Sequence, residues 1–318
     1  MEEPLLSVCV ITYNHAAFIR QTLESVAMQK VNFSMEFIIA DDCSRDGTTA
    51  LIEAFIATYP GTVIFLKREK NIGAADNFIG MIGSARGKYV AYMEGDDYWT
   101  HPLKLQMQVD YLEKNEALVL SSHNSTILLN TGESFPFNKD KRYSGGSHDE
   151  VYTIEDYITR DFFHSSSIVY RRSSLKPFPG WYRNAFGGDY FLVLLLGING
   201  RFHYINESMS VYRIHGKSIS SFSSRYEIAK NFDFHFTKFD EYSEFKYHQV
   251  LGKKQFSFQY NFFYYHPEYF KKFWFALAHL GKIIQMSPSV ISRWARFKIF
   301  IPTKFLRSKV NLFTKNQQ

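Results

Sequence analysis

The sequence predicts an α/β fold in which a mostly parallel sheet is covered by helices. Apolar, β-branched segments alternate with segments of helical spacing, and polar residues gather where the apolar segments end. Apolar strands of this kind are typical of a sheet buried on both faces, and strand–helix alternation leads to parallel pairing. After about residue 220 the segments become aromatic-rich with helical spacing, so we expect a helical C-terminal region.

The expected elements follow one another as strand, helix, strand. The run LLSVCVI at 5–11 is the first strand, and Phe18, Leu23 and Val26 have helical spacing in 14–29, with Asn14 at the cap position. Further strands are expected at 36–40, 62–67 and 88–93, with a short one at 202–205 (FHYI), and further helices at 49–59 and 77–85.

Length and composition indicate a large globular domain with an appendage. The chain has 318 residues, of which 45% are hydrophobic, enough to bury a substantial core. We expect a first domain at 1–220 and a helical, basic region at 221–318. The N-terminus begins with two acids and a short apolar run, unlike a secretory signal, so we expect a cytoplasmic protein. Cys9 and Cys43 are too few for a disulfide framework and are expected to be packing thiols.

The net charge of +6 comes from the C-terminal tail. The first 268 residues hold 27 basic and 31 acidic residues, whereas ten basic residues and no acidic ones follow Glu268. The tail mixes these charges with Ile, Val, Phe and Trp but has no apolar run long enough to span a bilayer. We expect it to lie on an anionic membrane surface, the alternative being a basic, solvated face.

Polar residues stand at four expected strand ends: TYN at 12–14, DD at 41–42, KNIG at 70–73 and EGDD at 94–97. The carboxyl ends of parallel strands share one edge of the sheet, where ligands bind. We therefore expect these residues to converge on one crevice. Thr12 and Asn14 could instead cap the first helix, and the aspartates could be solvated loop charges.

The turn after the first strand argues against a dinucleotide site. It reads TYNHAAF and lacks the glycines that let the backbone approach a pyrophosphate. A divalent cation bound by carboxylates is the common substitute, because Mg²⁺ and Mn²⁺ prefer oxygen ligands and bridge to substrate phosphates. Glu94 and Asp96, two residues apart at a strand end, are candidates for that metal.

Four blocks in this order resemble the family 2 glycosyltransferases of the GT-A fold: SVCVITYN, IIADDCSRDGT, NIGAADN and KYVAYMEGDDYWTHPLKLQMQ. The resemblance runs from about residue 5 to residue 218. It implies a GT-A-like, Rossmann-like sheet, and transfer of a sugar from a nucleotide diphosphate sugar to an acceptor with inversion of configuration.

The resemblance also implies roles for single residues. Thr12 and Asp42 would contact the nucleoside, with Asp42 accepting a hydrogen bond from the base, and Asn71 would lie near the nucleotide. Glu94 and Asp96 match the DxD element that binds the metal. The family usually has aspartate at the first of these positions. The longer Glu94 would reach the metal directly or through a water molecule, and Asp96 is the better candidate ligand.

Two further blocks belong to the acceptor half. Asp189 stands just before the apolar helix expected from FLVLLLG, and His215 lies in SVYRIHGKSISS. By the resemblance, Asp189 is the general base and His215 completes the metal site. Direct displacement at an anomeric carbon needs one carboxylate on the acceptor side to take the hydroxyl proton. Taken alone, Asp189 could be a helix cap and His215 a structural histidine.

The expected function is an inverting, metal-dependent glycosyltransferase of hexosyl or N-acetylhexosaminyl type. Its donor is a nucleotide diphosphate sugar, with UDP the first candidate by family frequency, and its acceptor is a glycan or lipid-linked glycan of surface polysaccharide or lipopolysaccharide synthesis. It would act in the cytoplasm, on the inner face of the cytoplasmic membrane if the tail binds there, and no nucleic-acid partner is expected. The alternatives are a phosphoryl or nucleotidyl transferase and a non-catalytic sugar-nucleotide binding subunit.

Overall fold

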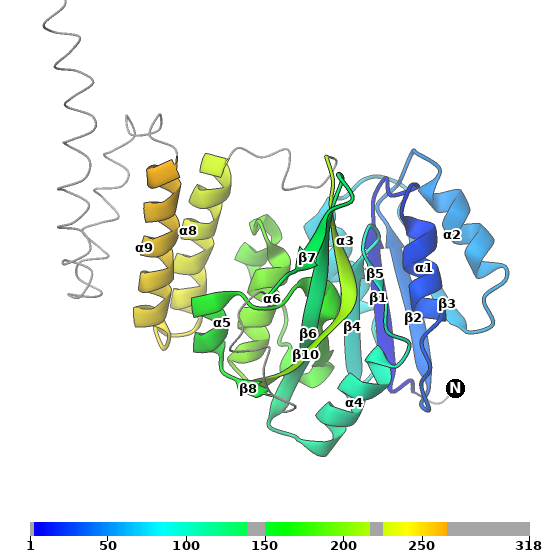
Figure 1. Cartoon of the computed structure of the whole chain (residues 1–318), viewed down its shortest axis with the longest axis horizontal. Helices are drawn as coiled ribbons and strands as arrows, with labels where there is room; N and C mark the ends of the chain where they lie inside the picture. Colours follow the sequence, from blue (N-terminus) through cyan, green and yellow to red (C-terminus); the bar gives the residue numbers. More distant parts are fainter. Residues whose placement is uncertain (1–2, 139–149, 217–224, 266–318) are drawn as a thin grey trace, which may run out of the picture. The chain divides into compact units, whose positions relative to one another are not determined.

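The computed structural model describes residues 3–138, 150–216 and 225–265. The chain divides into two compact units, Met1–Ser224 and Arg225–Gln318. The first unit contains a mixed sheet whose strand order is β3-β2-β1-β4-β9-β6-β10-β5, with β7 paired to β6 and β8 paired to β10. Figure 1 shows helices on both sides of this sheet.

The first half of the sheet is parallel. β1 pairs with β2 on one side and with β4 on the other, and β2 pairs with β3. The elements of this half are β1 (Leu6–Thr12), α1 (Ile19–Ala27), β2 (Met35–Asp41), α2 (Thr48–Ile56), β3 (Thr62–Lys67), α3 (Ala74–Gly83) and β4 (Tyr89–Glu94). The predicted strands and the mostly parallel α/β class are confirmed.

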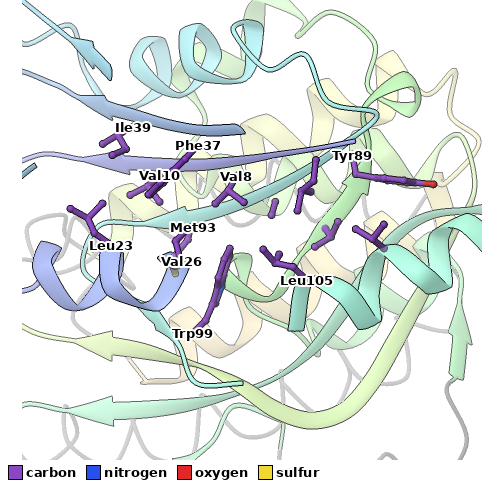
Figure 2. Close-up of a cluster of buried hydrophobic side chains, with 14 of the residues drawn as sticks. Val8, Val10, Leu23, Val26, Phe37, Ile39, Tyr89, Met93, Trp99 and Leu105 are labelled. Atoms are coloured by element: carbon purple, nitrogen blue, oxygen red, sulfur yellow. The ribbon is translucent and has the colours of Figure 1, made fainter. Parts of the chain in front are cut away.

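Alternate residues of the strands form two apolar layers. Val8 and Val10 of β1 face the same layer as Phe37 and Ile39 of β2, and Leu23 of α1 packs into that layer (Figure 2). Helices α1, α2 and α4 (Lys104–Lys114) cover this face, whereas α3 packs on β1 and β2 from the other face. Because both faces are covered, the strands could be apolar throughout, as the sequence indicated.

The second half of the sheet mixes directions. The antiparallel strand β9 (Val169–Arg171) lies between β4 and β6 (Leu118–Leu129), and β10 (Arg201–Ile214) runs parallel to β6. β5 (Tyr98–Trp99) pairs antiparallel with β10. The remaining elements of this half are β7 (Ser134–Pro136), β8 (Glu150–Tyr152), α5 (Ile154–Arg160), α6 (Gly188–Gly197) and 3₁₀ turns at Ser165–Ser167, Arg172–Ser174 and Gly180–Asn184.

Two boundaries differ from those expected. β10 extends far beyond the strand expected at 202–205. Residues 206–208 are exposed and coincide with shifts in the register, but the pairing with β6 resumes after them. Helix α1 begins only at Ile19, with Phe18 at the cap position. Asn14 lies four residues earlier, in the left-handed region with φ of 56°, and does not cap it. These polar positions interrupt the apolar pattern without ending the strand or starting the helix.

The second unit begins with two helices, α8 (Arg225–Tyr242) and α9 (His248–Tyr265), which pack against each other. Phe236 and Phe239 of α8 are buried, as are Leu251 and Phe256 of α9. The expected helical, aromatic-rich character is therefore confirmed for these residues, while the exact boundary at 220 stays a prediction. The basic tail after Glu268 lies outside the described residues. In the described part of the chain, no helix is long and apolar enough to cross a membrane.

Candidate active site

The carboxyl ends of β1, β2 and β4 bring the predicted polar residues to one edge of the sheet. β1 ends at Thr12 and pairs with both β2 and β4, so Thr12, Asp42 and Glu94 follow three neighbouring strands. β10 reaches the same edge from the second half, because β5 pairs Tyr98 with Val211. This pairing places the chain after β4 beside the end of β10.

Asp96 and His215 meet at this edge. His215 Nε2 lies 2.9 Å from Asp96 Oδ2, and both residues are buried. His15, which the sequence analysis missed, approaches the same oxygen with its Nε2 at 3.7 Å, and its Nδ1 lies 3.2 Å from Thr12 Oγ1. The other carboxylate oxygen of Asp96, Oδ1, is buried and has no hydrogen-bond partner among the residues that the structure describes.

Glu94 lies apart from the Asp96–His215 pair in its hydrogen bonding. The Tyr92 hydroxyl donates to Glu94 Oε1 at 3.1 Å. Burial, together with the negative charges of Asp96 and Asp189, raises the pKa of Glu94 to about 8. The Glu94 carboxyl group therefore lies near Asp96 and Asp189. Among the described residues, its hydrogen-bond partner is the Tyr92 hydroxyl, not a charged group.

The residues present fit a divalent cation shared with a diphosphate. Among the described residues, no group of three or more His, Cys, Asp and Glu side chains is arranged to hold a metal ion by itself. Mg²⁺ and Mn²⁺ are commonly bound by one or two carboxylates plus substrate phosphates, so a closed protein cage is not required. The unpartnered Oδ1 of Asp96, with His215 beside Oδ2, supplies such a partial set. Glu94 as a third ligand stays a prediction.

Arg213 holds the segment that carries Asp96 through hydrogen bonds, a role that the sequence analysis missed. Its backbone N–H donates to Asp97 Oδ1 at 3.0 Å, while its guanidinium donates to the Asp96 carbonyl and to Gln21 Oε1. The guanidinium carbon lies 4.3 Å from the centre of the Tyr98 ring and 5.3 Å from that of Phe18. Arg213 thus joins β10, two residues before His215, to the chain after β4.

Asp97 is a third residue to which the sequence analysis gave no role of its own, although it belongs to the EGDD motif. It is buried, and burial raises its pKa well above the ordinary range, with the charges of Asp96 and Glu94 adding to the effect. Its Oδ2 lies 3.6 Å from His164 Nδ1, beyond hydrogen-bonding distance. Asp97 therefore connects the EGDD segment to β10 and lies near His164.

Asp42 and Asn71 come together after β2 and β3. The backbone N–H groups of Ile72 and Gly73 donate to Asp42 Oδ1 and Oδ2 at 2.8 and 2.9 Å. Asn71 Nδ2 donates to the Asp42 carbonyl at 3.3 Å. The carboxylate of Asp42 thus orders residues 71–73, and each oxygen still has a second lone pair for a ligand.

Asn14 fixes the neighbouring loop. Its backbone N–H donates to Ser44 Oγ at 2.8 Å, and its side-chain Oδ1 accepts from the backbone N–H of Arg45 at 2.8 Å. Asp46 extends this network by accepting from the backbone N–H of Ala16 at 3.0 Å. Asn14 therefore has a structural role in this loop, and its expected part in the ligand-binding crevice stays a prediction.

Asp189 lies in the first turn of α6 rather than at its cap. The cap residue is Gly187, whose φ of 71° suits glycine. Burial raises the pKa of Asp189, while the backbone N–H groups of Tyr190 and of Asp189 itself oppose that rise. The buried Tyr182 donates from its hydroxyl to the Gly188 carbonyl at 2.9 Å and so holds the start of α6. The acid is thus fixed on a rigid element and placed to titrate above an ordinary aspartate.

The family profile described as glycosyl transferase family 2 matches residues 7–177. An uncharacterized protein of Mycobacterium tuberculosis, Rv1520, is 34% identical over 67% of this chain and 60% of its own length. Abequosyltransferase RfbV of Salmonella typhimurium is 32% identical over 52% of this chain and 48% of its own length. The chain thus spans about 60% of the length of the first curated relatives it matches.

Two solved structures share the fold at low identity. Residues 1–349 of TarS of S. aureus, in complex with UDP-GlcNAc, are similar with a TM-score of 0.64 and 18% identity, covering 88% of this chain and 81% of that chain. The mannosyltransferase PcManGT of Pyrobaculum calidifontis, in complex with GDP-Man and Mn²⁺, has a TM-score of 0.57 and 15% identity, covering 97% of this chain and 84% of that protein. The predicted GT-A-like fold is confirmed. Because the family profile covers more than half of the sequence, the chain belongs to glycosyl transferase family 2.

Proposed function

We propose that the protein is an inverting, metal-dependent glycosyltransferase that uses a nucleotide diphosphate sugar. The contact between Asp96 and His215, beside an unpartnered carboxylate oxygen and on the same sheet edge as Asp42, is the observation that carries this proposal. UDP is the first nucleotide to test, because the related fold of TarS binds UDP-GlcNAc.

The nucleotide part of the donor would lie against the ends of β1 and β2. Asp42 is buried and already ordered by Ile72 and Gly73, so it can accept a hydrogen bond from the base without losing side-chain freedom. Thr12 and Asn71 complete this wall of the proposed site. Asn14 supports it from behind by holding residues 44–45.

The diphosphate would lie beside Asp96 and His215, which would hold a divalent cation together with phosphate oxygens. A cation bound there neutralises the negative charge that develops on the leaving diphosphate. The protein's own contribution is to keep Asp96 and His215 in place, through the contacts of Arg213 with the Asp96 carbonyl and the Asp97 carboxylate.

Asp189 would serve as the general base on the acceptor side. Its carboxylate takes the proton of the acceptor hydroxyl while that oxygen bonds to the anomeric carbon and the bond from this carbon to the diphosphate oxygen breaks. A single displacement of this kind inverts the configuration. Since burial raises the pKa of Asp189, its carboxylate is a stronger base than that of an exposed aspartate.

We further propose an acceptor from surface polysaccharide or lipopolysaccharide synthesis and a transferred sugar of the hexosyl or N-acetylhexosaminyl type. The names of two relatives support this context: abequosyltransferase RfbV and the teichuronic acid biosynthesis glycosyltransferase TuaG of Bacillus subtilis, which is 35% identical over 35% of this chain. A cytoplasmic reaction at the inner face of the membrane would suit a lipid-linked acceptor.

A thermal-shift screen of nucleotide sugars tests this function. UDP-, GDP- and dTDP-sugars are added to the full chain with Mn²⁺ or with EDTA, and the melting temperature is compared with that of the free protein. At a ligand concentration 100 times the Kd, binding stabilises the folded state by about 2.7 kcal/mol. At least one sugar nucleotide should raise the melting temperature in Mn²⁺ and lose most of this effect in EDTA. No shift with any nucleotide sugar would refute the proposal.

A further inference from the structure

His164 precedes the 3₁₀ turn Ser165–Ser167 and caps it with its ring. Its Nδ1 accepts from the backbone N–H of Ser166 at 3.3 Å and lies 3.0 Å from the Ser166 hydroxyl oxygen. An Nδ1 that accepts a backbone hydrogen bond carries no proton, so the neutral ring has its proton on Nε2. Burial lowers the pKa of His164 to about 4, which keeps the ring neutral at physiological pH.

The Nε2–H group of His164 has no hydrogen-bond partner in the described part of the chain. It is also not sealed from solvent. The side chain is 12% exposed. Its ring stacks on Tyr212 with 4.0 Å between ring centres and an interplanar angle of 22°, and Phe137 lies 5.7 Å away. The ring is therefore fixed in orientation and presents one N–H donor to solvent.

The surroundings of His164 place it between Asp96, at the proposed diphosphate site, and Asp189, the proposed general base. Asp97 Oδ2, in the residue next to Asp96, lies 3.6 Å from His164 Nδ1. On the other side, the adjacent Ser165 lies close to the Asp189 carboxyl. The stacked Tyr212 lies within electrostatic reach of both acids: burial raises its pKa most, and the charges of neighbouring acids, including Asp96 and Asp189, add to this. In a displacement reaction, the anomeric carbon lies between the leaving diphosphate and the base. A sugar held between Asp96 and Asp189 therefore lies beside His164.

We infer that His164 donates a hydrogen bond from Nε2 to an oxygen of the transferred sugar and so helps to select the donor. This inference rests on the proposed glycosyltransferase function. A sugar hydroxyl or an acetamido carbonyl can accept such a bond. A sugar that lacks the matching oxygen would leave a desolvated donor unpaired, which is a strong basis for discrimination.

Two substitutions separate the sugar contact from the structural role of the ring. In His164→Asn, the amide oxygen lies near the position of Nδ1 and can still cap the Ser166 N–H, but nothing occupies the position of Nε2. In His164→Gln, the longer side chain can carry an N–H donor to the position of Nε2. The asparagine variant should therefore lose the sugar contact, and the glutamine variant should recover part of it.

Calorimetric titration with Mn²⁺ present measures this contact. The ligands are UDP-GlcNAc, UDP-glucose, GDP-mannose and dTDP-rhamnose, each with its free nucleoside diphosphate, and the ratio of the two Kd values isolates the contribution of the sugar. For the nucleotide sugar that wild type binds most tightly, His164→Asn should weaken binding about threefold to tenfold, the effect of one hydrogen bond, without changing the Kd of the free nucleotide. The affinity of His164→Gln for this nucleotide sugar should lie between those of wild type and His164→Asn.

The alternative outcomes separate this inference from the proposed function. If wild type binds a nucleotide sugar and His164→Asn binds it equally well, the assignment of His164 is wrong while the proposed function stands. If His164→Asn weakens the free nucleotide and the nucleotide sugar equally, His164 is structural and the assignment is again wrong. If wild type binds none of these nucleotides, the proposed function fails, and the inference fails with it.

Discussion

At the scale of single residues, Asp189 is the most direct target for testing the chemistry. Asp189→Asn keeps the size of the side chain but cannot accept the acceptor proton. Turnover should fall roughly 100-fold or more, the scale of general base catalysis, while the Kd of the nucleotide sugar stays close to that of wild type. Steady-state kinetics and calorimetric titration of the same protein measure the two quantities. A parallel loss of donor binding would instead assign Asp189 to the nucleotide site.

The same substitution should change how stability depends on pH. Because burial raises the folded-state pKa of Asp189 above its unfolded value, the folded protein binds more protons than the unfolded chain in the interval between the two values. Ionisation of Asp189 therefore costs stability as pH rises through that interval. Asparagine has no such cost, so Asp189→Asn should melt at a higher temperature than wild type at pH 8, with a smaller difference at pH 5. A variant that melts below wild type at pH 8 would contradict this account of the buried carboxyl.

The site residues could be predicted from the sequence only in part. Asp96 and His215 were paired through the order of family motifs, and the structure places them 2.9 Å apart. Arg213 was missed because its partners lie far away in the sequence: its guanidinium contacts the carbonyl of Asp96, 117 positions away. No local pattern of charge or hydrophobicity marks such a contact.

At the scale of elements, the connection between β10 and the chain after β4 determines the geometry of the proposed metal site. Arg213 uses its planar guanidinium for two donations and for stacking on Tyr98, which a lysine cannot reproduce. Arg213→Lys should weaken Mn²⁺-dependent binding of UDP by roughly tenfold, the equivalent of about 1.4 kcal/mol. Calorimetric titration of UDP in Mn²⁺ checks this.

A matched control lies on the same strand. Arg201→Lys makes the same substitution at the exposed start of β10, at the opposite end from His215. It should bind UDP and Mn²⁺ like wild type. If Arg213→Lys also binds like wild type, Arg213 does not position the site.

Element boundaries could be predicted where burial is uniform. The strands at 62–67 and 88–93 were found within one residue because their apolar runs are continuous and bounded by polar residues. The long strand β10 was recognised only at 202–205, since exposed residues 206–208 interrupt its apolar pattern while the pairing with β6 resumes beyond them. A strand that contains a bulge cannot be delimited by hydrophobic periodicity alone.

At the scale of the whole molecule, the basic tail after Glu268 is expected to bind an anionic membrane surface. Ten basic residues without an acidic residue, mixed with Ile, Val, Phe and Trp, suit the boundary between headgroups and acyl chains. Each basic residue near an anionic leaflet contributes about 1 kcal/mol. The full chain should co-sediment with phosphatidylserine-containing liposomes at low salt and be released as salt rises.

The control for the tail is a chain that ends at residue 268. It should stay in the supernatant under the same conditions, whereas liposomes of neutral lipid should not retain either protein. If the full chain also stays in the supernatant at low salt, the tail is a basic, solvated surface, and the expected membrane contact is wrong.

The central claim is that Asp96 and His215 bind a nucleotide diphosphate through a divalent cation, and calorimetric titration of UDP tests it most directly. Wild type, Asp96→Ala and, as a control, Glu116→Ala at an exposed acid are each titrated in Mn²⁺ and in EDTA. We predict that wild type and Glu116→Ala bind UDP at least about tenfold more tightly in Mn²⁺ than in EDTA, a difference of about 1.4 kcal/mol. Asp96→Ala should bind weakly in both, with a melting temperature near that of wild type. Equal UDP affinity for Asp96→Ala and wild type, or an affinity of wild type that EDTA leaves unchanged, would contradict the account.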